Sequence, residues 1–87
     1  MVRDEWMPLS SLPPGRAAQV GALAGGRGFV SHLVALGFTP GAKVIMVQNF
    51  GRGPLIVLVR NTRVALGRGE AAKIWVSPEE DHGRRGY

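Results

Sequence analysis

Residues 33–47 read Leu-Val-Ala-Leu-Gly-Phe-Thr-Pro-Gly-Ala-Lys-Val-Ile-Met-Val, and this stretch decides the fold. Leu36-Gly37 predicts a helix end, because glycine enters the left-handed conformation without a Cβ penalty. Pro40-Gly41 predicts a type II turn, in which proline presets φ and the following glycine takes positive φ. The apolar run at residues 44–47 is rich in β-branched side chains and predicts a strand. Gly37, Pro40 and Gly41 are therefore structural turn residues between a short helix and a small β-structure.

The helix is predicted from about residue 28 to residue 36. Phe29, Leu33 and Leu36 fall at i, i+4 and i+7 and so share one helical face. Residues 24–28 before it are glycine-rich but lack the Lys-Ser/Thr ending of a P-loop and the GxGxxG spacing of a dinucleotide site. We interpret these glycines as a corner between a strand and the helix.

About five short strands are predicted around this helix. They span residues 16–23, 43–49, 55–60, 64–66 and 73–76. Asn61-Thr62 is predicted to form a two-residue hairpin turn, and residues 67–72 a single helical turn before the last strand. Short strands joined by Gly and Pro turns indicate a mainly β protein with a small barrel. The pattern alone leaves an SH3-like barrel and an OB-fold open.

Length and composition set the remaining bounds. The 87 residues make one domain, predicted over residues 8–76, with a flexible N-terminus at 1–7 and a disordered tail at 77–87. The absence of cysteine excludes disulfides and thiolate zinc sites. No apolar run approaches the roughly 18 residues of a membrane span, so we expect a cytoplasmic protein without membrane insertion.

Positive charge is concentrated in the body of the chain. Between Trp6 and Val76 there are eight basic residues and one acid, Glu70. Such a body can serve solubility, or it can meet nucleic acid, an anionic membrane or an acidic protein. The strands at 43–49, 55–60 and 64–66 carry no aromatic residue for stacking on bases, which argues against nucleic acid.

Candidate chemistry is sparse. His32 and His82 are the only histidines, and no Ser/His/Asp spacing or paired carboxylate lies in the predicted domain, so we predict no enzyme activity. His32 is a weak metal candidate with Glu70, since a ferrous site needs several converging imidazole and carboxylate ligands. We expect a solvated histidine and no cofactor, with a weak or bridging divalent metal between molecules as the alternative.

Several segments resemble the FeoA family of small cytosolic ferrous iron transport proteins. The resemblance is carried by Leu-x-x-Leu-Gly-x-x-Pro-Gly at residues 33–41 and by Ala-Leu-Gly-Arg-x-x-Ala-x-x-Ile-x-Val at residues 65–76. Leu12-Pro13-Pro14-Gly15 and Gly53-Pro54-Leu55 add to it. It implies an SH3-like barrel with an inserted helix. At Ser31-His32 this chain departs from the basic residues that the family usually carries before the helix leucine.

The resemblance also implies a function. It implies a non-enzymatic accessory protein of ferrous iron uptake that binds the cytosolic part of the membrane GTPase transporter FeoB, as a monomer or weak homodimer. The alternative is a free-standing regulatory module related to the C-terminal barrel of metal-dependent repressors of the diphtheria-toxin-repressor type. The expected contact residues are Arg52, Leu55, Val57, Arg60, Arg63 and Arg68.

Overall fold

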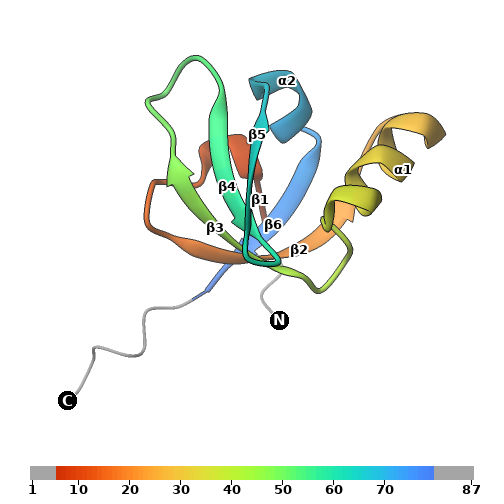
Figure 1. The fold of residues 1–87 in the computed structure, drawn as a ribbon, viewed down its shortest axis with the longest axis horizontal. Helices are drawn as coiled ribbons and strands as arrows, with labels where there is room; N and C mark the ends of the chain where they lie inside the picture. The colour runs from red at the N-terminus through yellow and green to blue at the C-terminus, as the bar shows by residue number, and fades with distance from the viewer. Residues whose placement is uncertain (1–5, 80–87) are drawn as a thin grey trace.

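The structure is a computed structural model that describes residues 6–79, which form six strands, two α-helices and one 3₁₀ helix. In chain order these are β1 (Met7–Pro8), the 3₁₀ helix η2 (Leu9–Ser11), β2 (Ala17–Leu23), α1 (Arg27–Leu36), β3 (Lys43–Gln48), β4 (Leu55–Val59), β5 (Thr62–Leu66), α2 (Arg68–Ala71) and β6 (Ile74–Pro78). The strands pair in the order β1-β6-β2-β3-β4-β5, all antiparallel. The strongly curved sheet wraps into a small barrel, with α1 to one side (Figure 1).

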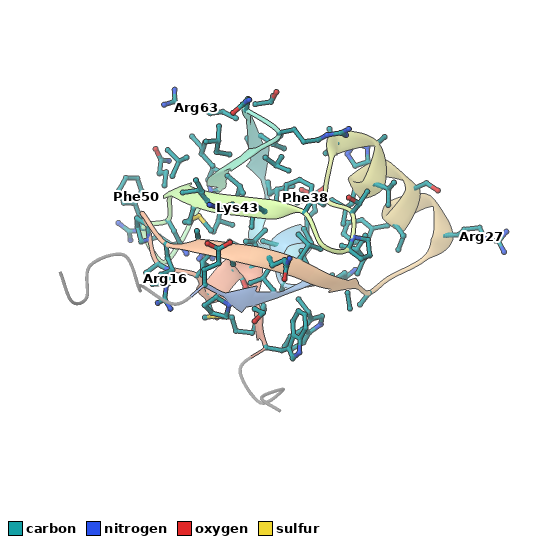
Figure 2. The ribbon with its side chains drawn as sticks, turned by 90° about the horizontal axis from the view of Figure 1, so that it is seen from below. Arg16, Arg27, Phe38, Lys43, Phe50 and Arg63 are labelled. Atoms are coloured by element: carbon teal, nitrogen blue, oxygen red, sulfur yellow. The ribbon has the colours of Figure 1, made fainter. Side chains whose placement is uncertain are left out.

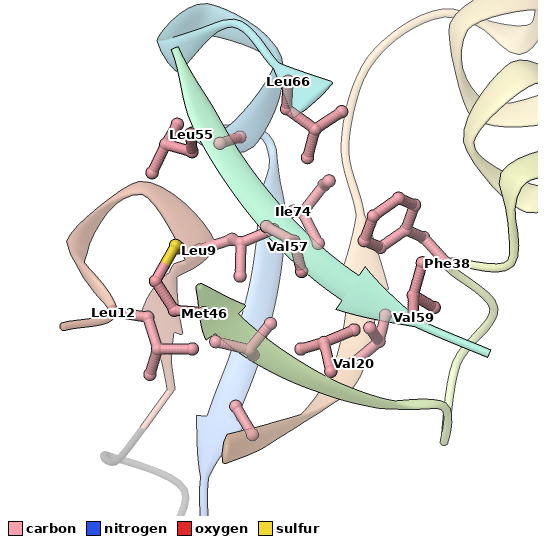
Figure 3. Close-up of a cluster of buried hydrophobic side chains, with 14 of the residues drawn as sticks. Leu9, Leu12, Val20, Phe38, Met46, Leu55, Val57, Val59, Leu66 and Ile74 are labelled. Atoms are coloured by element: carbon pink, nitrogen blue, oxygen red, sulfur yellow. The ribbon is translucent and has the colours of Figure 1, made fainter. Parts of the chain in front are cut away.

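The core fills the inside of this barrel. Its side chains come from η2 and the residue after it, from α1, from Phe38, from α2 and from the strands β2 to β6, and they meet as one cluster (Figure 3). Leu9, Leu33, Phe38 and Ile74 are each fully buried, and none of the described buried side chains is polar. The core is therefore held by apolar packing, while polar groups are kept at the surface.

The segment from α1 to β3 has the predicted turn chemistry. Gly37 caps α1 with a φ of 110°, and its amide donates to the carbonyls of Leu33 and Val34. Gly41 has a φ of 93°, and the amide of Ala42 donates to the Thr39 carbonyl at 2.9 Å, which closes a four-residue turn around Pro40 and Gly41. This is the geometry of a type II turn.

The β4–β5 hairpin turn differs from the predicted one by one residue. Val59 pairs with Thr62, so the turn residues are Arg60 and Asn61 rather than Asn61 and Thr62. Both have positive φ, 54° and 62°, which is the requirement of a type I′ turn. Strand β5 consequently begins at Thr62, two residues before the predicted start at Val64.

The sheet is longer at both chain ends than predicted. Met7 pairs with Val76 in β1, so this residue is not part of a flexible N-terminus. Ser77 and Pro78 pair with Gln19 and Ala18, so they belong to β6 and not to a disordered tail. Both extensions depend on partners far away in the chain, which local sequence does not reveal. Among residues 6–79, no helix has the length and apolar character needed to cross a bilayer.

Candidate functional site

The outward face of β3, β4 and β5 presents a row of apolar side chains that ends in a cation. Ile45 pairs with Leu58, and Leu58 pairs with Arg63, so the three side chains stand next to one another across the sheet. A second pair, Ile56 and Ala65, lies beside this row. Ile45, Ile56 and Leu58 are half-buried although they point away from the core. A face of this kind is suited to contact with another apolar surface.

One end of the row opens into a groove of about 400 Å³. The groove is lined by Ala42, Lys43, Ile45, Leu58, Arg60 and Asn61. Its apolar side chains come from paired positions of β3 and β4, and its cations come from the start of β3 and from the hairpin turn. The arrangement therefore combines an apolar lining with positive charge at its rim, and it fits an apolar segment that carries acidic groups.

Arg60 is fixed at this rim by the backbone. Its φ of 54° is uncommon for a residue without the freedom of glycine or asparagine. Its Cδ lies 2.6 Å from the position that a Cβ on Gly37 would occupy, so the aliphatic part of Arg60 rests on the end of α1. Gly37 is thus required for its own positive φ, and the absence of a Cβ there also leaves room for the Arg60 side chain. The contact joins the hairpin turn to the helix end.

The surroundings of the groove are positively charged. Residues 43–69 contain five cations and no acid. Lys43 has Glu79 at 3.7 Å, but both side chains are largely exposed, so the pair contributes little. Glu70 instead accepts a hydrogen bond from the Gly67 amide at 3.0 Å and caps α2. The acids among the described residues therefore leave the cations of the outward face largely uncompensated.

Three of the six predicted contact residues are exposed, two are fully buried and one, Arg68, is half-buried. Arg52, Arg60 and Arg63 are exposed, with Arg60 and Arg63 at the hairpin and Arg52 in the β3–β4 loop. The prediction for Leu55 and Val57 is wrong, because both side chains are fully buried in the core. The outward residues of β4 are Ile56 and Leu58, one position away. Since β4 is apolar on both faces, its sequence could not show which face is inside.

Arg68 is engaged in hydrogen bonds within the protein. Its guanidinium donates to the carbonyl oxygens of Gly53 and Ser10 at 3.0 and 3.1 Å and to Oδ1 of Asn49 at 2.7 Å. The Asn49 side-chain amide in turn donates to the carbonyls of Ser10 and Leu12 at 3.0 and 2.9 Å. Arg68 therefore has a structural role, and its contact with a partner stays a prediction.

Sequence reasoning also missed members of the face. Lys43, Ala42, Ile45 and Asn61 line the groove but were not predicted contacts. The alternation along β3 could have indicated Lys43 and Ile45, because Val44 and Met46 are buried and their neighbours must point outward. It could not have indicated Ala42, which precedes the strand, or Asn61, which lies in the hairpin turn. Which outward residues form a groove depends on pairing with β4, and that information is not local.

His32, the weak metal candidate, is exposed on α1. Within residues 6–79 no group of three or more His, Cys, Asp or Glu side chains lies close enough to hold a metal ion. Phe29 on the same helix has the Lys73 ammonium 5.2 Å from its ring centre, which ties α1 to the segment before β6. His32 therefore lies on the helix surface and is not part of a cluster of metal ligands among residues 6–79.

Comparison with known proteins places the whole described region in one family. A family model described as the FeoA domain matches residues 7–78. Fe(2+) transport protein A of Methanocaldococcus jannaschii is 33% identical over 73 residues, covering 84% of this chain and 88% of that protein.

Solved structures of FeoA proteins are also similar to this chain. An iron uptake regulatory protein, FeoA, has a TM-score of 0.81 and 34% identity over 85% of this chain and 99% of that one. FeoA of Stenotrophomonas maltophilia, solved with zinc and described as a prokaryotic SH3 domain protein, has a TM-score of 0.74 and 35% identity over 85% and 96%. A manganese-dependent transcriptional repressor has a TM-score of 0.76 at 18% identity, over 85% of this chain and 42% of the repressor, which shows the fold alone. The predicted SH3-like barrel is confirmed.

Proposed function

Because the chain belongs to the FeoA family, whose domain spans residues 7–78, we propose that it is a non-enzymatic accessory protein of ferrous iron uptake. It binds the cytosolic part of a FeoB-type GTPase transporter, as a monomer or weak homodimer, and modulates transport without performing chemistry. It acts in the cytoplasm, and ferrous iron is the cargo of the transporter rather than a cofactor of this chain.

The observation that carries the proposal is the apolar row of Ile45, Leu58 and Arg63 with the cationic groove beside it. Burial of such side chains in a complex is favourable at about 25 cal/mol for each Å² of apolar surface removed from water. The flanking cations add attraction to an acidic partner, and this attraction raises the association rate more than the affinity. The partner segment is therefore expected to be apolar with acidic flanks.

Val47 and Val34 provide a matched pair for the test. Each valine is 39% exposed, but Val47 lies on β3 at the proposed surface and Val34 lies on α1. In a calorimetric titration with the cytosolic domain of the cognate transporter, Val47→Ser is expected to weaken binding by about fivefold, from the loss of buried apolar area. Val34→Ser should leave the affinity unchanged.

The proposal can be contradicted by a binding measurement combined with an uptake measurement in cells. No binding by the unmodified protein at high micromolar concentration, together with full ferrous iron uptake in a deletion strain, would contradict the proposal. Equal weakening by the two valine substitutions would place the contact elsewhere on the molecule.

The regulatory alternative is supported only by the shared fold of the repressor barrel. A partner of that kind would be a DNA-binding protein or a proline-containing segment rather than the transporter. If the titration with the transporter domain fails while the chain binds such a regulator, this alternative replaces the first proposal.

A further inference from the structure

Phe50 is the most exposed of the large apolar side chains in the described residues. It is 76% exposed, whereas the next, Trp6, is 43% exposed. Phe50 lies in the loop of residues 49–54 between β3 and β4, which extends beyond the ends of both strands (Figure 1). Figure 2 shows Phe50 at the end of the molecule opposite Arg27. A single exposed apolar residue is ordinary, but the loop around Phe50 is anchored on both sides.

The base of the loop is tied to the body of the barrel. The Asn49 side chain donates to the carbonyls of Ser10 and Leu12 and accepts from the Gly51 amide at 3.0 Å. Arg68 donates to the Gly53 carbonyl from the other side. Phe50 thus projects from a loop whose flanking residues are fixed. Because the backbone around Phe50 is already ordered, little conformational entropy is lost when the ring is buried on binding.

Two cations lie in or beside the loop that carries Phe50. Arg52 follows in the same loop, and the sequence from residue 43 to residue 69 contains no acid. The Arg68 guanidinium donates to the Gly53 carbonyl of this loop at 3.0 Å. Lys43 and Arg63 lie at the other end of β3 and β4, beside the hairpin turn. An aromatic side chain among cations is the combination that favours an anionic lipid surface, where the ring enters the headgroup region and the cations meet the charge.

We propose that the loop of residues 49–54 docks on an anionic lipid surface, with Phe50 inserted at the interface and Arg52 in contact with headgroups. A protein hot spot needs a ring of surrounding contacts that exclude water. Phe50 has exposed Gly51 and Arg52 beside it and is open on most sides, so it offers no such ring. A lipid surface requires only a projecting ring and positive charge. The loop is separate from the groove beside Leu58, so this contact is additional to the proposed transporter binding.

The test is flotation of the full chain with lipid vesicles that contain no protein. At low salt the chain should float with phosphatidylcholine vesicles containing about one-third phosphatidylglycerol, and not with phosphatidylcholine alone. Phe50→Ser should lower the partition coefficient by about tenfold, from loss of the inserted ring. Arg52→Gln should lower it by about fivefold, from loss of one charge. Val34→Ser is the control and should float like the unmodified chain.

Three results would overturn the proposal. They are no flotation of the unmodified chain with anionic vesicles, equal flotation of Phe50→Ser and unmodified chain, and equal loss for Phe50→Ser and Val34→Ser. If Phe50→Ser floats normally but binds the transporter domain less tightly, Phe50 belongs to a protein contact instead. Circular dichroism of each variant verifies the fold. Because the vesicles carry lipid alone, the outcome is independent of whether the transporter is the partner.

Discussion

The guanidinium Nη2 of Arg68 lies 2.7 Å from Oδ1 of Asn49 and connects the start of α2 to the end of β3. Through Asn49 this contact reaches the carbonyls of Ser10 and Leu12, which belong to the N-terminal segment. Three stretches far apart in the sequence are therefore joined by one amide group. The contact also gives one arginine of the acid-free segment a structural role.

Asn49→Ala is predicted to destabilise the fold by about 1–3 kcal/mol, because it removes the hydrogen bond to the partly buried Leu12 carbonyl and one partner each of the Ser10 carbonyl and the Arg68 guanidinium. Gln19→Ala is the control, since the Gln19 side chain is exposed and its bond to the Gly41 carbonyl is 3.3 Å long. Urea denaturation followed by circular dichroism measures both. Equal stability of Asn49→Ala and the unmodified chain would show that water replaces these hydrogen bonds at no cost.

Substitution of Arg60 in the hairpin turn is expected to raise stability and to weaken binding. Arg60→Asn should raise the free energy of unfolding by about 0.5–1 kcal/mol, because asparagine tolerates positive φ better than arginine does. The same change should weaken transporter binding, since it removes a cation from the groove rim. Asn61→Gly is the matched variant, because it also relieves the turn but retains Arg60. Weaker binding by both variants would mean that turn geometry, and not the charge of Arg60, matters for the partner.

Two leucines on opposite faces of β4 should respond differently to substitution. Leu55→Ala removes a fully buried side chain and should cost about 2–5 kcal/mol of stability. Leu58→Ser lies on the outward face and should reduce stability by less, about 1 kcal/mol, while weakening partner binding about tenfold. Thermal denaturation and a binding titration separate the two effects. A severe loss of stability in Leu58→Ser with normal binding of the remaining folded protein would assign Leu58 to the core.

The C-terminal boundary of the fold can be tested by truncation. A chain that ends at Val76 loses the pairing of Ser77 and Pro78 with β2, and the two hydrogen bonds that the Arg16 guanidinium donates to the Glu79 carbonyl. We predict a loss of about 1–3 kcal/mol relative to a chain that ends at Glu79, which keeps these contacts. Equal melting temperatures for the two chains would show that the end of β6 adds nothing to the fold.

The sequence predicts those parts of the fold that depend on local chemistry. The end of α1 at Gly37 and the turn at Gly41 follow from positive φ, which few residues besides glycine accept, and Phe29, Leu33 and Leu36 mark the helix face through their spacing. The sequence does not show which face of β4 points into the core, because Leu55 and Ile56 are equally apolar. This is decided by pairing with β3 and β5.

The same limit applies to the functional surface. Arg63 and Arg68 look alike in the sequence, each in a basic and apolar stretch. The structure separates them, since Arg63 stands next to Leu58 on the outward face while Arg68 is bound by Asn49, Ser10 and Gly53. β1 was missed for a related reason. Two residues that include a proline carry no strand signal, and only their pairing with β6 makes them a strand.

The central claim is that the outward face of β3, β4 and β5 binds an acidic part of the transporter, and the charge reversal Arg63→Glu tests it most directly against Arg27→Glu. Both arginines are exposed and both reversals change the net charge from +5 to +3, but Arg27 lies on α1 at the far end of the molecule (Figure 2).

Binding isotherms with the cytosolic domain of the cognate transporter should be recorded over a series of salt concentrations. We predict that Arg63→Glu weakens binding by about tenfold at low salt, that the deficit shrinks as salt rises, and that Arg27→Glu has little effect. Equal weakening by the two reversals, or full affinity of the folded Arg63→Glu protein at low salt, would contradict the claim.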